Sequence, residues 1–462
     1  MRRGTGLKII LLLIELLLLA AVVALRLYPE LARPLLWESP PAETTAPTAA
    51  APEPEPAETP TSTPEPTLEP TPEPTLEPTP EPTPEPTPEP TPTPEPEAEQ
   101  LKIRVLNRRK DCPLLTDGRY ESSMGIFRGD TVTVSAEEPI AYLYVQWEAP
   151  PKPWTLRCGE HEQSQGEQGF FHEFVVLPEP SVEVEMQIYE KDDAVFAEIM
   201  AFGVGTKPDW VQDWQAPQEQ ADLLVIPTHS DDEFIFLGGL IPKSVAEGLR
   251  VQVVYIVEHH GFRRHEMLDS LWEAGVRNYP VTSRCADIYV DTVGKARREY
   301  GSNYMTGFLV EQIRRFRPQV VVGQAEDGDS GHPVHIFGVE CLKAALEQSA
   351  VTGAYPESEE KYGLYDVPKA YLHRYGPEAD WTVLDYETPL EHFGGATAFD
   401  MAERAFQKCV TQYKDGKYHV YGVGSEHDSH CFGLYRTLLG PDEEKNDLFE
   451  HVDLALLGEK NG

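Results

Sequence analysis

The fold of the second half of this chain is decided by one short stretch, Leu223-Leu224-Val225-Ile226-Pro227-Thr228-His229-Ser230-Asp231-Asp232-Glu233. Its first four residues are apolar, which is typical of a strand that is buried on both faces of a parallel sheet. One imidazole and three carboxylates follow that strand directly. Because ligands of open α/β sheets bind beyond the carboxyl ends of the strands, these polar side chains stand where a site is expected.

From residue 221 onward, apolar strands alternate with helical stretches, which predicts a mainly parallel, Rossmann-like sheet covered by helices on both faces. We expect two further buried strands at 251–257 and 319–322. The expected helices span 239–247, 264–274, a stretch that ends at 317, and about 334–349. We assign residues 221–462 to this α/β domain.

A second polar cluster follows the strand predicted at 319–322 and reads Glu326-Asp327-Gly328-Asp329-Ser330-Gly331-His332-Pro333-Val334-His335. The carboxyl ends of parallel strands meet at one edge of a sheet, so we expect the two clusters to converge. A catalytic zinc takes three His or carboxylate ligands and keeps a position open for water, and a cation also relieves the repulsion among crowded acids. The alternative is a helix N-terminus that carries acids for capping, which leaves His229 without a role.

Together the two clusters resemble the motifs of the PIG-L/LmbE-like zinc-dependent N-deacetylases, which remove acetyl groups from substrates that contain N-acetylglucosamine. The family's first motif, His-Pro-Asp-Asp-Glu, is matched by His229-Ser230-Asp231-Asp232-Glu233, and its second, His-Pro-Asp-His, by His332-Pro333-Val334-His335. The resemblance covers roughly residues 221–462. It departs from the family at Ser230, where a proline is usual, and at Val334, where an aspartate that could orient an imidazole is missing.

The resemblance implies a role for each matched residue. His229, Asp232 and His335 would bind Zn²⁺, Asp231 would be the general base, and His332 would polarise the substrate carbonyl or stabilise the oxyanion. Arg263 and Glu266 look like the family's Arg-x-x-Glu segment, so Arg263 would contact substrate. The alternative for Arg263 is a charge on a helix surface, paired with a neighbouring acid. His259 follows the strand predicted at 251–257, which favours a place on the rim of the substrate site.

Residues 1–26 are predicted to form a transmembrane signal anchor. Basic residues precede an apolar run at 9–25 that is interrupted only by Glu15, and such a run is just long enough to cross a bilayer core of ~30 Å. The alternative is a signal peptide that is cleaved after Val22-Val23-Ala24. Because the basic flank precedes the run, we expect a single-pass protein of the cell membrane whose catalytic domain is extracytoplasmic.

Residues 27–100 are predicted to form a disordered stalk that is rich in Pro, Thr and Glu. A Thr-Pro-Glu-Pro repeat runs through 64–96. Repeated proline favours an extended polyproline conformation, and the regularly spaced glutamates repel one another, so this segment should act as a semi-rigid spacer.

The formal net charge of −38 argues against nucleic acid as a partner, because phosphate binding needs a concentrated basic face and none is visible in the sequence. The six cysteines lie far apart without a Cys-x-x-Cys pair, which does not indicate a zinc knuckle. Outside a membrane they could pair as disulfides, and they could equally stay as buried thiols.

Residues 101–206 contain short alternating runs separated by turn residues, which predicts a β-sandwich. The clearest expected strands are 131–134, 140–145, 173–177 and 182–186. The stretches 115–120 and 197–203 weakly resemble the ends of discoidin-like galactose-binding modules. An ordered connector is expected at 207–220.

These features predict a multi-domain, membrane-tethered, extracytoplasmic zinc hydrolase that removes acetyl groups from an N-acetylated amino sugar or an envelope glycan. Two alternatives stay open. One is a metal-dependent hydrolase that cleaves another bond with the same site. The other is a non-catalytic, glycan-binding surface protein with a vestigial α/β domain, which the retention of every expected ligand and of Asp231 disfavours.

Overall fold

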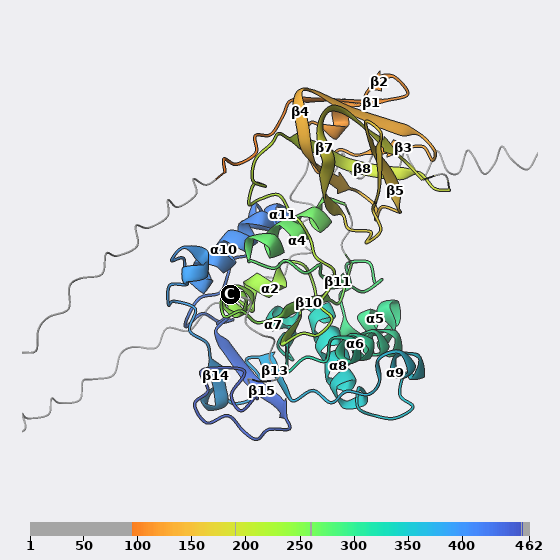
Figure 1. The fold of residues 1–462 in the computed structure, drawn as a ribbon. Helices are drawn as coiled ribbons and strands as arrows, with labels where there is room; N and C mark the ends of the chain where they lie inside the picture. Colours follow the sequence, from red (N-terminus) through yellow and green to blue (C-terminus); the bar gives the residue numbers. More distant parts are fainter. Residues whose placement is uncertain (1–94, 190, 259–260, 454, 456–462) are drawn as a thin grey trace, which may run out of the picture. The chain divides into compact units, whose positions relative to one another are not determined.

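The computed structural model describes residues 95–189, 191–258, 261–453 and 455, and these residues contain two sheets (Figure 1). They fall within one compact unit, Pro90–Gly462. Within the described ranges no helix has both the length and the apolar character that crossing a membrane requires. The anchor predicted at 1–26 and the stalk up to residue 94 lie outside the described residues, so both stay predictions. The predicted domain boundaries also stay predictions.

The last residues of the predicted stalk are part of the folded unit. Glu97 pairs with Thr206, and Gln100 pairs with Phe202. The Ala98 side chain is buried, and its backbone N–H donates to the Thr206 carbonyl at 2.8 Å. Ordered structure therefore begins a few residues before Leu101, because an alanine within the acidic segment finds an apolar site.

The first sheet has eight strands in the order β2-β1-β4-β7-β5-β6, with β8 paired to both β4 and β3. All of its pairings are antiparallel. Its strands are β1 (Ile103–Asn107), β2 (Lys110–Asp111), β3 (Met124–Ile126), β4 (Thr131–Trp147), β5 (Trp154–Cys158), β6 (His161–Gln165), β7 (His172–Gln187) and β8 (Ala194–Phe202), and a 3₁₀ turn lies at Pro113–Leu115.

Two predictions for this sheet are wrong in detail. The strands expected at 131–134 and 140–145 are one strand, β4, and those expected at 173–177 and 182–186 are also one strand, β7. Prolines lie between the two predicted halves of each strand, and proline is a turn signal in a sequence. In the structure both strands continue through these prolines, and the pairing of β4 with β7 only shifts its register there. An irregularity of this kind tolerates the missing N–H of proline. All eight strands are hydrogen-bonded into one connected sheet, and the β-sandwich stays a prediction.

The second sheet has seven strands in the order β11-β10-β9-β12-β13-β15-β14. The first five are parallel, as predicted, and β15 runs antiparallel to both of its neighbours. Its strands are β9 (Leu223–Ile226), β10 (Val251–Tyr255), β11 (Val281–Thr282), β12 (Val320–Gly323), β13 (Lys369–His373), β14 (Trp381–Val383) and β15 (Cys431–Thr437). The chain leaves β9 toward β10 and later returns on its other side as β12. The gap between β9 and β12 is therefore a topological switch point.

Helices cover both faces of this sheet, which confirms the predicted α/β architecture. Leu223 and Val225 of β9 contribute to one apolar core, together with residues of α3, α4 and α10. Leu224 and Ile226 contribute to a second core, together with residues of α6 and α8. This division follows from the alternation of side chains along a strand. Figure 1 shows α6, α8 and α9 grouped together, apart from α4, α10 and α11.

The helices of this part are α2 (Asp232–Ile235), α3 (Leu240–Ala246), α4 (Phe262–Glu273), α5 (Val293–Ala296), α6 (Ser302–Phe316), α7 (Gly328–Gly331), α8 (Pro333–Gln348), α9 (Pro356–Tyr362), α10 (Ala398–Lys408) and α11 (Val410–Tyr413). A π-helical turn lies at Arg297–Gly301, and 3₁₀ turns lie at Glu378–Asp380 and Glu391–Phe393. The predicted helices correspond to α3, α4, α6 and α8, within a few residues at each end.

Helix α4 also contacts the first sheet through polar groups. Tyr120 Oη donates to Asp269 Oδ2 at 2.9 Å, and Arg264 Nη1 donates to the Glu148 carbonyl at 3.0 Å. His265 and His172 lie with their ring nitrogens 2.7 Å apart. The helix that carries Arg263 is therefore fixed from both sheets.

All six cysteines are free thiols, and five of them are buried. The sequence left disulfides and thiols open, and the structure shows thiols.

A buried ion pair fixes the C-terminal segment to the second sheet. Lys369 in β13 is fully buried, and its Nζ donates to Asp442 Oδ1 at 2.6 Å and to the Glu450 carbonyl at 2.8 Å. Tyr371 Oη donates to the other oxygen of Asp442 at 2.5 Å. An intact buried ion pair adds little net stability to a fold, because burying both charges is costly. Removing one partner is much more destabilising, because the other charge then stays buried without compensation.

Replacing Lys369 with Met is expected to lower the free energy of unfolding by about 3–5 kcal/mol, because the Asp442 carboxylate then stays buried without its cation. Urea denaturation measures this. The double variant Lys369→Met, Asp442→Asn should recover most of the loss, since it removes both charges. A single variant as stable as the parent would contradict the role of this pair.

Candidate active site

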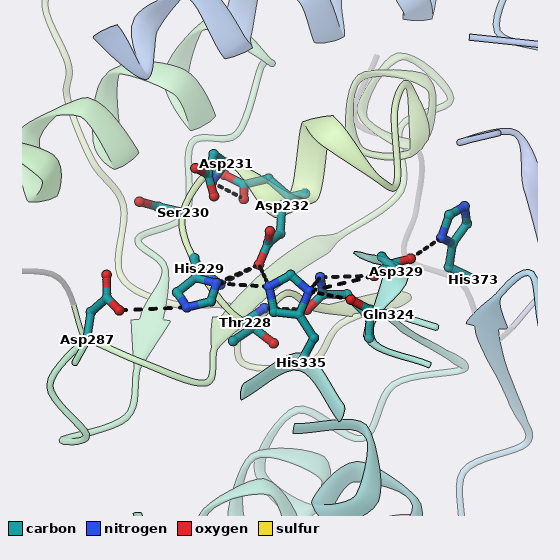
Figure 2. Close-up of polar contacts among 12 residues, drawn as sticks. Thr228, His229, Ser230, Asp231, Asp232, Asp287, Gln324, Asp329, His335 and His373 are labelled. Atoms are coloured by element: carbon teal, nitrogen blue, oxygen red, sulfur yellow. Dashed lines mark hydrogen bonds and ion pairs between the residues drawn. The ribbon is translucent and has the colours of Figure 1, made fainter. Parts of the chain in front are cut away.

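The two polar clusters converge at the switch point, as the sequence predicted. The first follows β9 and the second follows β12, and these strands are parallel neighbours. Figure 2 shows His229, Asp232 and His335 pointing toward one another. His229 Nδ1 lies 3.1 Å from Asp232 Oδ2 and 3.0 Å from His335 Nε2, and the last two atoms lie 3.2 Å apart.

This donor set fits a zinc ion. Tetrahedral zinc with bonds of about 2.0–2.1 Å sets its ligand atoms about 3.3 Å apart, close to the three observed separations. His335 Nδ1 lies 3.1 Å from the Gly328 carbonyl, which only accepts, so we assign the ring proton to Nδ1. The lone pair of Nε2 then faces the other two donor atoms, which is the arrangement of a metal-binding imidazole.

His332 lies beside this triangle. One ligand atom from each of His229, His332 and His335 falls within 4.8 Å of the others, so these histidines form a wider set that could hold a metal. We favour Asp232 over His332 as the third ligand, because its oxygen lies 3.1 and 3.2 Å from the other two donor atoms, close to the spacing that zinc sets. Burial and the two neighbouring imidazoles lower the pKa of His332 to about 4. Its Nδ1 is buried and has no hydrogen-bond partner among the described residues.

Electrostatics within the triangle favour opposite charges on its members. Burial would raise the pKa of Asp232, but His335 and His229 hold it well below its usual value. Burial would lower the pKa of His335, yet the Asp232 carboxylate raises it overall. The Asp232 carboxylate therefore stays ionised, and its negative charge favours a cation that would replace the proton on the imidazole.

Asp231 directly precedes α2 and has a strained backbone conformation. Its φ is 142°, where residues with a side chain are rare. The buried Glu233 holds this conformation: its Oε2 accepts from the Asp231 backbone N–H at 2.9 Å, and its Oε1 accepts from Tyr255 Oη at 2.6 Å. Burial raises the pKa of Glu233 to about 7. Glu233, the last acid of the first cluster, therefore stabilises the backbone of Asp231, the first acid of that cluster.

Arg263 reaches this turn from α4. Its Nη2 lies 3.4 Å from Asp231 Oδ2 and donates to the Ser230 carbonyl at 3.2 Å, and its Nη1 donates to Asp287 Oδ2 at 3.1 Å. Arg263 thus belongs to the site and is not a charge on an outer helix surface. Burial and the Asp232 charge raise the pKa of Asp231 well above its usual value, while Arg263 and His229 oppose that rise.

These residues line a cavity of about 200 Å³. Its wall holds the predicted His229, Asp231, Asp232, Arg263, His332 and His335, and also Ile235, Phe236, Asp287, Ser330, Gln412 and Tyr418. His259 lies outside the described residues, so its predicted place on the rim stays a prediction.

Three lining residues were missed from the sequence. Asp287 follows the strand β11, whose two residues gave too short an apolar run to be recognised. Gln412 and Tyr418 come from the end of α11 and the loop after it, far along the chain from both motifs. Glu266 connects that segment to α4, since its carboxylate accepts from the Thr411 backbone N–H at 3.0 Å and from Thr411 Oγ1 at 2.6 Å.

No family model matches the chain. Among curated proteins it is 31% identical over 193 residues to mycothiol S-conjugate amidase of Streptomyces coelicolor, a match covering 34% of this chain and 61% of that protein. It is 29% identical over 192 residues to 1D-myo-inositol 2-acetamido-2-deoxy-alpha-D-glucopyranoside deacetylase of Rhodococcus erythropolis, covering 35% and 61%. Both relatives support the resemblance to the PIG-L/LmbE-like deacetylases.

The similarity to these relatives is in line with the family predicted from the two motifs. The chain spans about three fifths of the length of these two curated relatives. Among solved structures, a conserved protein of Thermus thermophilus is 19% identical, with a TM-score of 0.33, and the match covers 48% of this chain and 97% of that one. The PIG-L/LmbE-like assignment concerns the α/β part, and the discoidin-like resemblance of the first sheet stays a prediction.

Replacing Glu233 with Ala is expected to lower the free energy of unfolding by about 2–3 kcal/mol, because it leaves the Asp231 N–H and the Tyr255 hydroxyl without partners. Thermal and urea denaturation of the metal-free protein measure this. Glu233→Gln is the matched control, since its amide can still accept from the Asp231 N–H. An alanine variant as stable as the glutamine variant would show that Glu233 does not secure the strained turn.

Proposed function

We propose that this chain is a zinc-dependent N-deacetylase that releases acetate from N-acetylated amino sugars. The observation that carries the proposal is the triangle of His229 Nδ1, Asp232 Oδ2 and His335 Nε2, with Asp231 in the same cavity. The relative from Rhodococcus erythropolis is by its name a deacetylase of an acetamido sugar, and the relative from Streptomyces coelicolor is an amidase. Both names describe attack on an amide bond.

His229, Asp232 and His335 would hold the zinc ion. When bound, zinc supplies Lewis-acid chemistry, which makes water more acidic and polarises a carbonyl oxygen. The rigid turns around the ligands keep three donors on one side and leave the cavity side open to substrate, as a catalytic site requires.

Asp231 is the proposed general base. Its carboxylate lines the cavity beside Asp232, and Arg263 holds one oxygen at 3.4 Å. Adjacent residues at the start of a helix point in different directions, so one faces the ligand triangle while the other faces the substrate. Asp231 takes a proton from the attacking water and can hand it to the departing amine.

His332 is proposed to stabilise the negative charge that develops on the acetamide oxygen. Its ring lies 5.0 Å from that of His229 and 4.5 Å from that of His335, measured between centroids. Burying the His332 Nδ1 atom without a hydrogen-bond partner costs free energy. If the His332 ring donates a hydrogen bond into the cavity, a substrate oxygen would accept it. Arg263 and Asp287 complete the polar wall opposite.

Cavity size favours a small acyl group. A volume of about 200 Å³ is less than the about 300–1,000 Å³ common for drug-sized ligands. An acetyl group with part of a sugar ring suits this space better than a long acyl chain does. The name of the relative from Rhodococcus erythropolis favours deacetylation over the alternative, hydrolysis of another bond by the same site.

Two variants of neighbouring residues test the roles. Asp231→Asn should keep zinc but lower the rate of acetate release by about 10²- to 10⁴-fold, which is the usual contribution of a general base. Asp232→Asn should lose zinc first, because it removes a ligand. Zinc content and acetate release from N-acetylglucosamine oligomers are measured on the same preparations of the full chain. A zinc-depleted Asp231→Asn variant, or one with the parent rate, would refute the assignment.

We also propose that the protein is anchored in a membrane with its α/β domain outside the cytoplasm, on the strength of the apolar run at 9–25 and the repeat that follows it. After expression in a bacterial host, the full-length chain should stay in the membrane fraction and be digested by protease added to intact spheroplasts. N-terminal sequencing checks the anchor itself. A mature chain that begins near residue 25 would show a cleaved signal peptide instead.

A further inference from the structure

A buried polar chain runs behind the metal triangle and joins three strand ends (Figure 2). The Thr228 backbone N–H donates to Gln324 Oε1 at 2.9 Å, Gln324 Nε2 donates to Asp329 Oδ2 at 3.2 Å, and Asp329 Oδ1 lies 2.5 Å from His373 Nδ1. We call Gln324, Asp329 and His373 the brace. All three side chains are at least 97% buried.

The brace contacts the metal ligands from two directions. Thr228 directly precedes His229, so the Gln324 amide fixes the backbone that carries the first ligand. On the other side, His335 Nδ1 lies 3.1 Å from both the Gly328 carbonyl and Gln324 Nε2, and 3.9 Å from Asp329 Oδ2. With its proton on Nδ1, the ring donates to the Gly328 carbonyl, and the brace acts on the ring through the turn that carries Gly328 and Asp329.

That turn is strained and needs an anchor. Gly328 has φ +75°, and a Cβ there would meet Ile336 Cγ1 at 2.8 Å. Asp329 has φ 59° and ψ −56°, outside the helical region, although it is not a glycine. Such conformations cost free energy and persist where the surroundings enforce them. His373, on the fully buried strand β13, supplies the enforcing contact through Asp329.

His373 is itself fixed at both ring nitrogens. Its Nδ1 faces Asp329 Oδ1, and its Nε2 lies 2.9 Å from the Asp428 carbonyl. Both neighbours are oxygen acceptors, so the ring cannot turn over without losing a hydrogen bond. The anchor of the turn is therefore rigid.

The second motif lacks the aspartate that is usual in the family. Val334 stands where the family has an aspartate beside the two histidines, and it is buried in the apolar core beneath α8. No carboxylate can act from that position. A buried carboxylate beside His335 is that of Asp329, which lies five residues before Val334 in the chain.

We propose that Asp329, held by His373, positions His335 for the metal and takes over the role of the aspartate that Val334 replaces. Asp329 is a positioning residue, since it belongs neither to the donor triangle nor to the residues that line the cavity. The inference rests on the proposed function, because it assumes that His335 is a metal ligand. It assigns this task to Gln324, Asp329 and His373, which lie outside both family motifs.

The test is zinc affinity of the full chain, measured by competition with a chromogenic chelator. Asp329→Asn keeps the size of the side chain but puts a donor against Gln324 Nε2 or against His373, so zinc affinity should fall by about 10- to 100-fold, as is usual for residues that orient a ligand. The absorption spectrum of the cobalt-substituted protein should shift as well, because the geometry of the ligands changes. Circular dichroism of the metal-free protein checks folding.

Two variants of His373 provide an independent arm. His373→Leu removes the contact to Asp329 and should weaken zinc binding to a similar extent. His373→Asn places an amide N–H near the position of Nδ1 and should restore most of the affinity. This arm keeps the inference testable if Asp329→Asn fails to fold.

Tyr371→Phe is the matched control. It removes a buried hydrogen bond from the same strand, to Asp442, while the brace stays intact. Its zinc affinity should equal that of the parent. An equal loss in this control, or parental affinity in both Asp329→Asn and His373→Leu, would overturn the inference while leaving the zinc site standing. A parent chain with no zinc affinity would overturn the proposed function, and this inference with it.

Discussion

Three atoms with lone pairs, His229 Nδ1, Asp232 Oδ2 and His335 Nε2, lie within 3.2 Å of one another. The Asp232 carboxylate attracts both imidazoles, and a cation among the three atoms would bind to all of them. The surrounding structure fixes each of them in place. Glu233 fixes the strained turn at Asp231, Arg263 ties that turn to α4, and the Gly328 carbonyl, on the turn that the brace anchors, holds the far edge of His335.

The order of the strands makes this crowding attainable. Because β10 and β12 lie on opposite sides of β9, the loops that follow β9 and β12 open toward the same crevice. The parallel pairing of these two strands sets Val320 against Leu223, and so fixes how far each polar loop extends beyond the sheet. Alternating apolar residues on β9 anchor the strand in two cores at once. The positions of the catalytic residues thus depend mainly on the rigid sheet, which places two short loops next to each other.

The sequence predicts a feature when the residues that determine it are close together in the chain. The all-apolar run at 223–226 and the acids after it lie within eleven residues, so strand, turn and site were readable together. The long strands β4 and β7 were divided in two because proline is a turn signal in sequence, and only their pairing shows that both continue. Asp329 was visible in the second cluster, but its partner His373 is 44 residues away. Gln412 and Tyr418 reach the cavity through the packing of α10 against α4 and the hydrogen bonds of Thr411 in α11 to Glu266, which no local pattern records.

The most direct measurement is X-ray absorption at the zinc edge on the full chain loaded with one equivalent of zinc. The account predicts a first coordination shell of nitrogen and oxygen at about 2.0–2.1 Å, with the outer-ring scattering of two imidazoles and no sulfur. Sulfur at about 2.3 Å would place the metal on cysteines instead. That result, or the absence of retained zinc, would contradict the site described for His229, Asp232 and His335.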